Sequence, residues 1–87
     1  MYYNINNINE TKTLKSVSGQ LIRVIVNTPG TIGSELTLHD GSTVDAPLIC
    51  RINTAIMHSS LLYDLECTSG LTYVTSGGPG NITIVYT

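Results

Sequence analysis

"LTYVTSGGPGNITIVYT", residues 71–87, contains two alternating segments separated by glycine and proline. In the second segment, Ile82, Ile84 and Tyr86 are separated from one another by single residues. This period of two is typical of a β-strand with one buried face. The intervening residues 76–81, SGGPGN, have the composition of a loop. The stretch therefore predicts two neighbouring strands at the end of the chain.

The same period recurs in earlier segments, at residues 20–27, 35–40, 48–53 and 61–67. QLIRVIVN (20–27) is nearly all apolar, which predicts a central strand covered on both faces. LLYDLEC (61–67) predicts a strand with Leu61, Tyr63, Leu65 and Cys67 inward and Asp64 and Glu66 outward. With 13–18 as a first strand, the pattern indicates an all-β fold, a small antiparallel β-sandwich or barrel of about seven strands.

Helix has one weak candidate, NTAIMHSSLL at 53–62, with Asn53 or Thr54 as its N-cap. No long pattern of period 3.6 extends it. His58 lies in this segment without a partner at metal-ligand spacing, and we interpret it as a surface or interface residue.

The composition predicts one domain with a thin core. A chain of 87 residues without Trp or Phe relies on Ile, Leu, Val and five Tyr for its apolar area. Domains of this size often need disulfides, metals or oligomerisation. Cys50 and Cys67 are too few for a disulfide scaffold, and two separate buried thiols are favoured over one bridge. No spacing suggests zinc, so neither a metal nor a cofactor is expected.

Charge disfavours two classes of partner. Four basic residues stand against six acidic ones, for a net charge of −2. This chain cannot build the basic patch of a nucleic-acid module, nor bind an anionic membrane surface by its charge. The N-terminus lacks the features of a signal peptide, and no segment approaches the ~20 apolar residues of a membrane span. We therefore expect a product made in the cytoplasm, with neither nucleic acid nor membrane as partner.

Residues 1–12 differ in kind from residues 13–87, which hold the period-two strands. The first segment is rich in Asn and carries four larger apolar or aromatic residues, Tyr2, Tyr3, Ile5 and Ile8. One interpretation is a disordered terminus. The other is an extended N-terminal arm in which these four residues form an interface with another chain. The sequence leaves both open.

Catalytic patterns are weak. His39 and Asp40 are adjacent, so on a strand they point to opposite faces and are poorly placed to orient one another. Asp64 and Glu66 on a plain strand read as a solvated face, since a calcium site needs more oxygen ligands. SGGPGN lacks the Lys and the following helix of a phosphate-binding loop. The sequence predicts a protein that is not an enzyme.

Two long segments, YDLECTSGLTYVTSGGPGNITIVYT (63–87) and SGQLIRVIVNTPGTIGSELTLHDG (18–41), resemble small virion proteins of tailed bacteriophages. In those proteins an aromatic residue ends a strand, and Asn-Gly-Leu, a Val/Thr-rich strand, a Gly-rich loop and a "TVVY"-like strand follow. The resemblance covers roughly residues 16 to 86. It departs from the pattern at Cys67, Ser69 and Asn81, where the family has an aromatic residue, Asn and, often, Asp.

The resemblance implies a head decoration or cement protein on the outer surface of the virion. Its partners would be the major capsid protein and further copies of itself, as a trimer or, less favoured, a dimer. A final strand with bare edges would then be covered by a neighbouring chain. A tail, baseplate or fibre-base protein is the first alternative. A small carbohydrate-binding sandwich is the second, disfavoured because Tyr63, Tyr73 and Tyr86 fall on predicted core faces.

Overall fold

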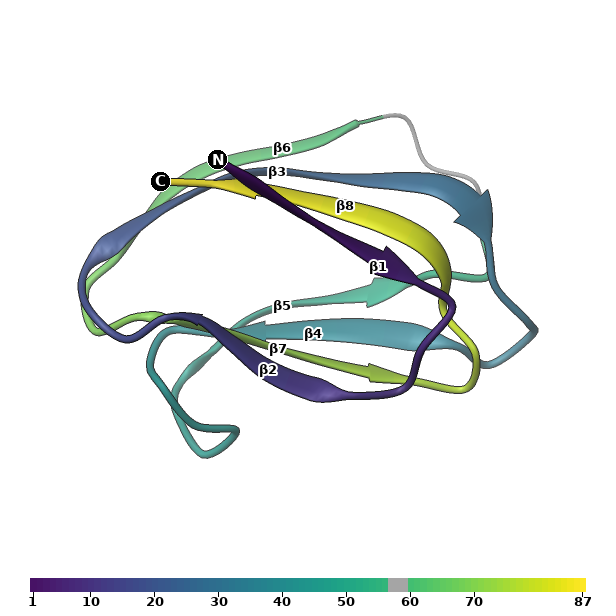
Figure 1. Ribbon diagram of the computed structural model, residues 1–87, viewed down its shortest axis with the longest axis horizontal. Coiled ribbons are helices and arrows are strands. Elements are labelled where there is room, and N and C mark those ends of the chain that lie inside the picture. Colours follow the sequence, from purple (N-terminus) through teal and green to yellow (C-terminus); the bar gives the residue numbers. More distant parts are fainter. Residues whose placement is uncertain (57–59) are drawn as a thin grey trace.

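The chain folds into two antiparallel four-stranded sheets that face each other as a β-sandwich (Figure 1). The computed structural model describes residues 1–56 and 60–87. Its strands are β1 (Tyr2–Asn6), β2 (Thr11–Lys15), β3 (Gly19–Pro29), β4 (Glu35–His39), β5 (Leu48–Asn53), β6 (Leu61–Cys67), β7 (Leu71–Ser76) and β8 (Gly80–Tyr86). The predicted all-β class is confirmed, with eight strands instead of about seven.

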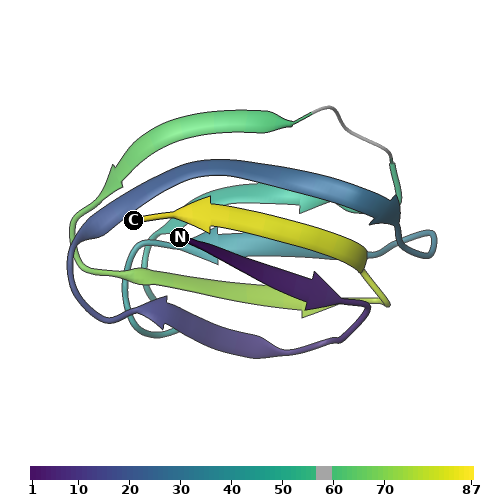
Figure 2. The same cartoon turned by 45° about the horizontal axis from the view of Figure 1, so that its top comes forward.

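The strand order is β1-β8-β3-β6 in the first sheet and β2-β7-β4-β5 in the second. The chain crosses between the sheets repeatedly, and both termini lie at the same end of the sandwich (Figure 2). There the backbone N–H of Tyr86 donates to the carbonyl of Met1, 2.9 Å away. The expectation that the final strand has bare edges is wrong, because β8 lies between β1 and β3.

The predicted division into an arm (1–12) and a β domain (13–87) is also wrong. Residues 2–6 form the edge strand β1. In this strand Ile5 pairs with Ile82 of β8, and its side chain is buried, with 1% relative exposure. The boundary at residue 12 falls inside β2, which pairs with β7. The Asn-rich composition hid a period of two, since Tyr3 and Ile5 point inward between outward asparagines.

The core lies between the two sheets and draws on both of them. Its buried members are Ile5, Leu21, Val24, Leu36, Leu38, Ile52, Cys67, Leu71, Tyr73, Ile82, Ile84 and Tyr86. β3 contributes Leu21 and Val24 to this cluster and buries Val26 as well, while Arg23 and Asn27 are exposed. The prediction that both faces of this strand are covered is therefore wrong. In a two-layered sandwich the outer face of each sheet has no layer above it.

Two local predictions also need correction. In the helix candidate, Asn53 ends β5, the next residues form a turn, and Leu61 and Leu62 begin β6. Residues 57–59, including His58, lie outside the described residues. In β6, Tyr63 and Asp64 together oppose the single residue Ile22, a bulge in which Asp64 has a φ of 50°. Leu65 remains partly exposed at this edge, although Cys67 is buried as predicted.

Candidate functional site

His39 and Asp40, the adjacent pair considered as catalytic candidates, each form hydrogen bonds with other parts of the fold. The Nδ1 atom of His39 lies 3.1 Å from the carbonyl of Ala46, and its Nε2 atom 3.2 Å from Oγ1 of Thr37. The carboxylate of Asp40 instead accepts hydrogen bonds from the backbone N–H groups of Ser69 (2.9 Å) and Thr68 (3.1 Å). His39 and Asp40 therefore do not orient each other, as predicted.

Asp40 connects the end of β4 to the turn between β6 and β7. The backbone N–H groups of Ser69 and Thr68 lower the pKa of its carboxyl group, because they stabilise the charged form. Thr68 Oγ1 adds a third hydrogen bond of 3.1 Å. These three hydrogen bonds hold the β6–β7 turn against the end of β4, so we assign Asp40 a structural role.

Asp64 and Glu66 lie beside a polar hollow of about 500 Å³ that also borders on Gln20 and Thr87. Asp64 accepts a hydrogen bond from the side-chain amide of Gln20. Both acidic residues are exposed. Within the described ranges, no group of three or more His, Cys, Asp or Glu side chains is placed to hold a metal ion.

The residues that the structure describes include no helix with the length and apolar character needed to cross a membrane.

The two cysteines are separate free thiols, as predicted. Cys67 is buried in the core, and Cys50 is half-buried in β5 beside the hydroxyl of Tyr63. Burial raises the pKa of both thiols. Burial and the neighbouring Cys50 likewise raise the pKa of Tyr63 to about 12. These groups therefore stay protonated near neutral pH, which disfavours nucleophilic chemistry.

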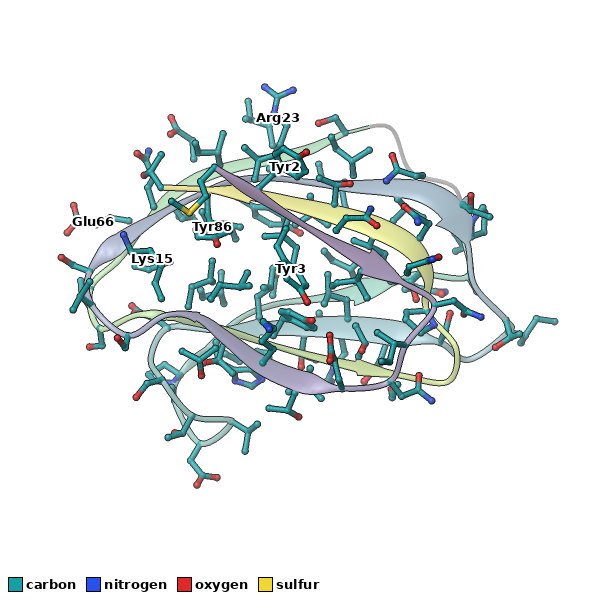
Figure 3. All side chains as sticks on the ribbon, in the orientation of Figure 1. Tyr2, Tyr3, Lys15, Arg23, Glu66 and Tyr86 are labelled. Atoms are coloured by element: carbon teal, nitrogen blue, oxygen red, sulfur yellow. The ribbon has the colours of Figure 1, made fainter. Side chains whose placement is uncertain are left out.

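The four residues predicted to form an interface have different environments. Ile5 is buried in the chain's own core, so its assignment to a contact with another chain is wrong. Tyr3 is half-buried and extends between the sheets (Figure 3), with Nζ of Lys12 5.1 Å from its ring centroid. Tyr2 and Ile8 are exposed. For these two the interface stays a prediction.

One side of the sandwich exposes apolar side chains along two strand edges. β6 and β5 are the last strands of their sheets, and Tyr63 of β6 lies against Cys50 of β5. The exposed apolar residues of these two strands are Leu62 (66% exposed), Leu48 (51%) and Leu65, beside the exposed polar residues Arg51, Asn53, Asp64 and Glu66. We call this side, defined by Leu48, Leu62 and Leu65, the β6 edge.

A second surface is polar and lies on the outer face of the first sheet. It consists of Asn4, Asn27, Asn81 and Thr83 and, at one end, Asn6. The amide nitrogen of Asn27 lies 2.9 Å from both Asn81 Oδ1 and Thr83 Oγ1. The amide nitrogen of Asn4 lies 2.8 and 3.2 Å from the same two oxygens. We call this set the amide face.

The amide face continues into a groove of about 420 Å³, the end groove. Asn6 and Asn81 belong to both. Its other lining residues are Asn7, Thr28, Pro29, Gly30, Thr31 and Gly80. Every described residue that lines it is uncharged.

Comparison of the chain with protein-family models, with curated protein sequences and with solved structures gives no significant match.

The sequence pattern predicts neither the amide face nor the β6 edge. The signal for the first was present in β1, where Asn4 and Asn6 alternate with the buried Ile5. The partners Asn27 and Asn81 are distant in sequence, and only the pairing of β8 with β1 and β3 brings them together. The β6 edge likewise depends on strand order, which the alternating pattern does not specify.

Proposed function

We propose that this chain is a non-enzymatic head decoration protein of a tailed bacteriophage. It would bind the outer surface of the capsid and staple neighbouring major capsid subunits. The exposed apolar β6 edge is the observation that carries this proposal. The resemblance of residues 16 to 86 to small virion proteins supports the choice of partner.

The β6 edge has the character of a protein contact. Among the described strands, β6 pairs only with β3 and β5 only with β4, so each has one edge without a neighbouring strand. Proteins usually shield such edges, and apolar side chains gathered beside them mark interaction sites. Complete coverage of Leu62 or Leu48 by a partner contributes about 1–2 kcal/mol each. Many copies on one shell multiply this modest energy through multivalent attachment.

The proposed arrangement is a homo-oligomer, with a trimer favoured over a dimer. Closed symmetric assemblies are the usual form of soluble oligomers, and an icosahedral capsid offers three-fold positions. Tyr2 and Ile8, which remain exposed, are further candidates for contact with a neighbouring chain.

The test is co-sedimentation with phage heads that lack the protein. Wild-type protein should bind the heads and raise the temperature at which they release DNA. The variant Leu62→Ser/Leu65→Ser should bind much more weakly while keeping a wild-type circular dichroism spectrum. Ile32→Ser is the matched control, because Ile32 is 100% exposed and lies in the β3–β4 connection.

Two outcomes would count against the proposal. Binding of the leucine variant at the level of the Ile32→Ser control would exclude the β6 edge as the contact. Failure of the wild-type protein to bind heads would reject head decoration. If the protein were then found in purified tails, the tail-component alternative would be favoured.

A further inference from the structure

We propose that the amide face and the end groove form a binding site for a neutral carbohydrate chain. This function goes beyond attachment to a capsid and uses a surface other than the β6 edge. It would let the protein hold a polysaccharide while its apolar edge contacts another protein.

The chemistry of the lining selects this class of ligand. Side-chain amides offer two donors and one acceptor oxygen, and threonine hydroxyls offer both functions. Sugar hydroxyls also donate and accept, so they match such a surface. The described residues of the amide face and end groove carry no charge. An anionic ligand would therefore find no counter-charge in the groove.

The amide face is ordered before any ligand arrives. Asn81 Oδ1 and Thr83 Oγ1 each accept hydrogen bonds from Asn4 and Asn27, which fixes the orientation of both amides. Binding then loses little side-chain entropy, a common source of affinity. Asn6 uses its Oδ1 and Asn27 its Nδ2 for hydrogen bonds within the face, so among the described residues Asn6 Nδ2 and Asn27 Oδ1 are left for a ligand.

The end groove is shaped by backbone that approaches closely. Gly80 has a φ of 81°, and a Cβ atom there would lie 2.1 Å from the carbonyl oxygen of Thr28. The backbone N–H of Asn7 donates to the carbonyl of Gly80 at 2.7 Å, and that of Thr31 to the carbonyl of Gly78 at 3.1 Å. The groove is therefore a preformed concavity, as small-ligand sites usually are.

An aromatic ring lies on the same face, in line with the amides. Tyr2, Asn4 and Asn6 share the outward side of β1, and Tyr2 is exposed. Four residues of strand separate Tyr2 from Asn6 by about 13 Å. This length exceeds one pyranose ring, so a linear chain of sugars fits the strip better than a single monosaccharide. The ring of Tyr2 would provide an apolar platform for one sugar.

The test is electrophoresis of the protein in native gels that contain dextran, laminarin, mannan or hydroxyethylcellulose. We expect at least one of these neutral polymers to retard the protein, equally at low and high salt. Asn6→Ala/Asn27→Ala should weaken the retardation about tenfold, the cost of losing well-placed hydrogen-bonding groups. Val44→Ala, in the β4–β5 loop, is the control and should behave as wild type.

A second measurement does not depend on how the variants fold. In the wild-type protein, the side-chain amide NMR signals of Asn6 and Asn27 should shift when the retarding polymer's oligosaccharide is added. No retardation by any of the four polymers would overturn the proposal. So would equal retardation of the double variant and the control, or unshifted amide signals. Leu62→Ser/Leu65→Ser should retain carbohydrate binding, which separates this test from that of head decoration.

Discussion

The ring of Tyr3 in β1 packs against the ring of Tyr73 in β7, with centroids 5.9 Å apart and planes inclined by 36°. This contact joins the first strand of one sheet to an inner strand of the other. The hydroxyl of Tyr73 also donates a hydrogen bond to the carboxylate of Glu10, in the connection between β1 and β2. The first ten residues therefore close one side of the core.

Truncation of Ile5 should destabilise the whole fold. Its side chain is buried among core residues, so Ile5→Ala is expected to lower the free energy of unfolding by about 2–4 kcal/mol. Ile8→Ala is the matched control, with a smaller expected change of about 0.5–1 kcal/mol because Ile8 is 48% exposed. Urea denaturation followed by circular dichroism measures both. Equal stability of the two variants would mean that β1 contributes little to the core.

Stability should fall at alkaline pH because of two tyrosines, the partly buried Tyr63 and the buried Tyr73. Burial raises the pKa of Tyr63 from 10.0 to about 12, and that of Tyr73 is also raised, by burial and by its bond to Glu10. A proton held more tightly in the folded state stabilises the fold fully below pH 10. This contribution is lost as the pH rises from 10 toward 12.

The measurement is Tm as a function of pH between 8 and 12. Tyr63→Phe should show a shallower decline than wild type above pH 10, because the variant has lost one of these groups. The exposed Tyr2→Phe should follow the wild-type curve. An identical decline in Tyr63→Phe would assign the alkaline loss to other groups.

The thiols should react slowly in the native protein. Burial raises the pKa of Cys50 and Cys67, so little thiolate forms at pH 8. We expect a thiol reagent to count 2 thiols in denatured, non-reduced protein and to modify Cys50 before the more deeply buried Cys67 in native protein. A count of zero after denaturation would instead show a disulfide, and rapid labelling of Cys67 would show that this part of the core opens readily.

How far the sequence predicts the fold depends on how local the determinant is. Alternation in 71–87 predicts β7 and β8, because the burial of every second side chain is visible within a short stretch of sequence. The order of strands in a sheet cannot be seen in a short stretch. The pairing of Tyr2 with Val85 joins opposite ends of the chain, and the short apolar pattern around Ile5 is masked by asparagines.

The candidate surfaces are harder to predict for the same reason. The exposure of Leu65, which the alternation places inward, follows from the position of β6 at the end of its sheet, where among the described strands it pairs only with β3. The amide face needs Asn27 beside Asn81, residues that β3 and β8 bring together. By contrast, the poor geometry of His39 and Asp40 was predictable, because the alternation along a strand is a local property.

Association in solution should depend on the β6 edge. With exposed apolar residues along two strand edges, the isolated protein is expected to form a dimer or trimer, with the trimer favoured. Leu62→Asp should shift it toward monomer, because a contact that covers this position would bury the new charge. Arg23 lies opposite Leu62 on β3, but burying both charges still costs desolvation energy. Light scattering coupled to size exclusion measures the mass, and Ile32→Asp in the β3–β4 connection controls for the added charge. A well-folded wild-type monomer at micromolar concentration would reject self-association, whereas an oligomer insensitive to Leu62→Asp would place the contact on another surface.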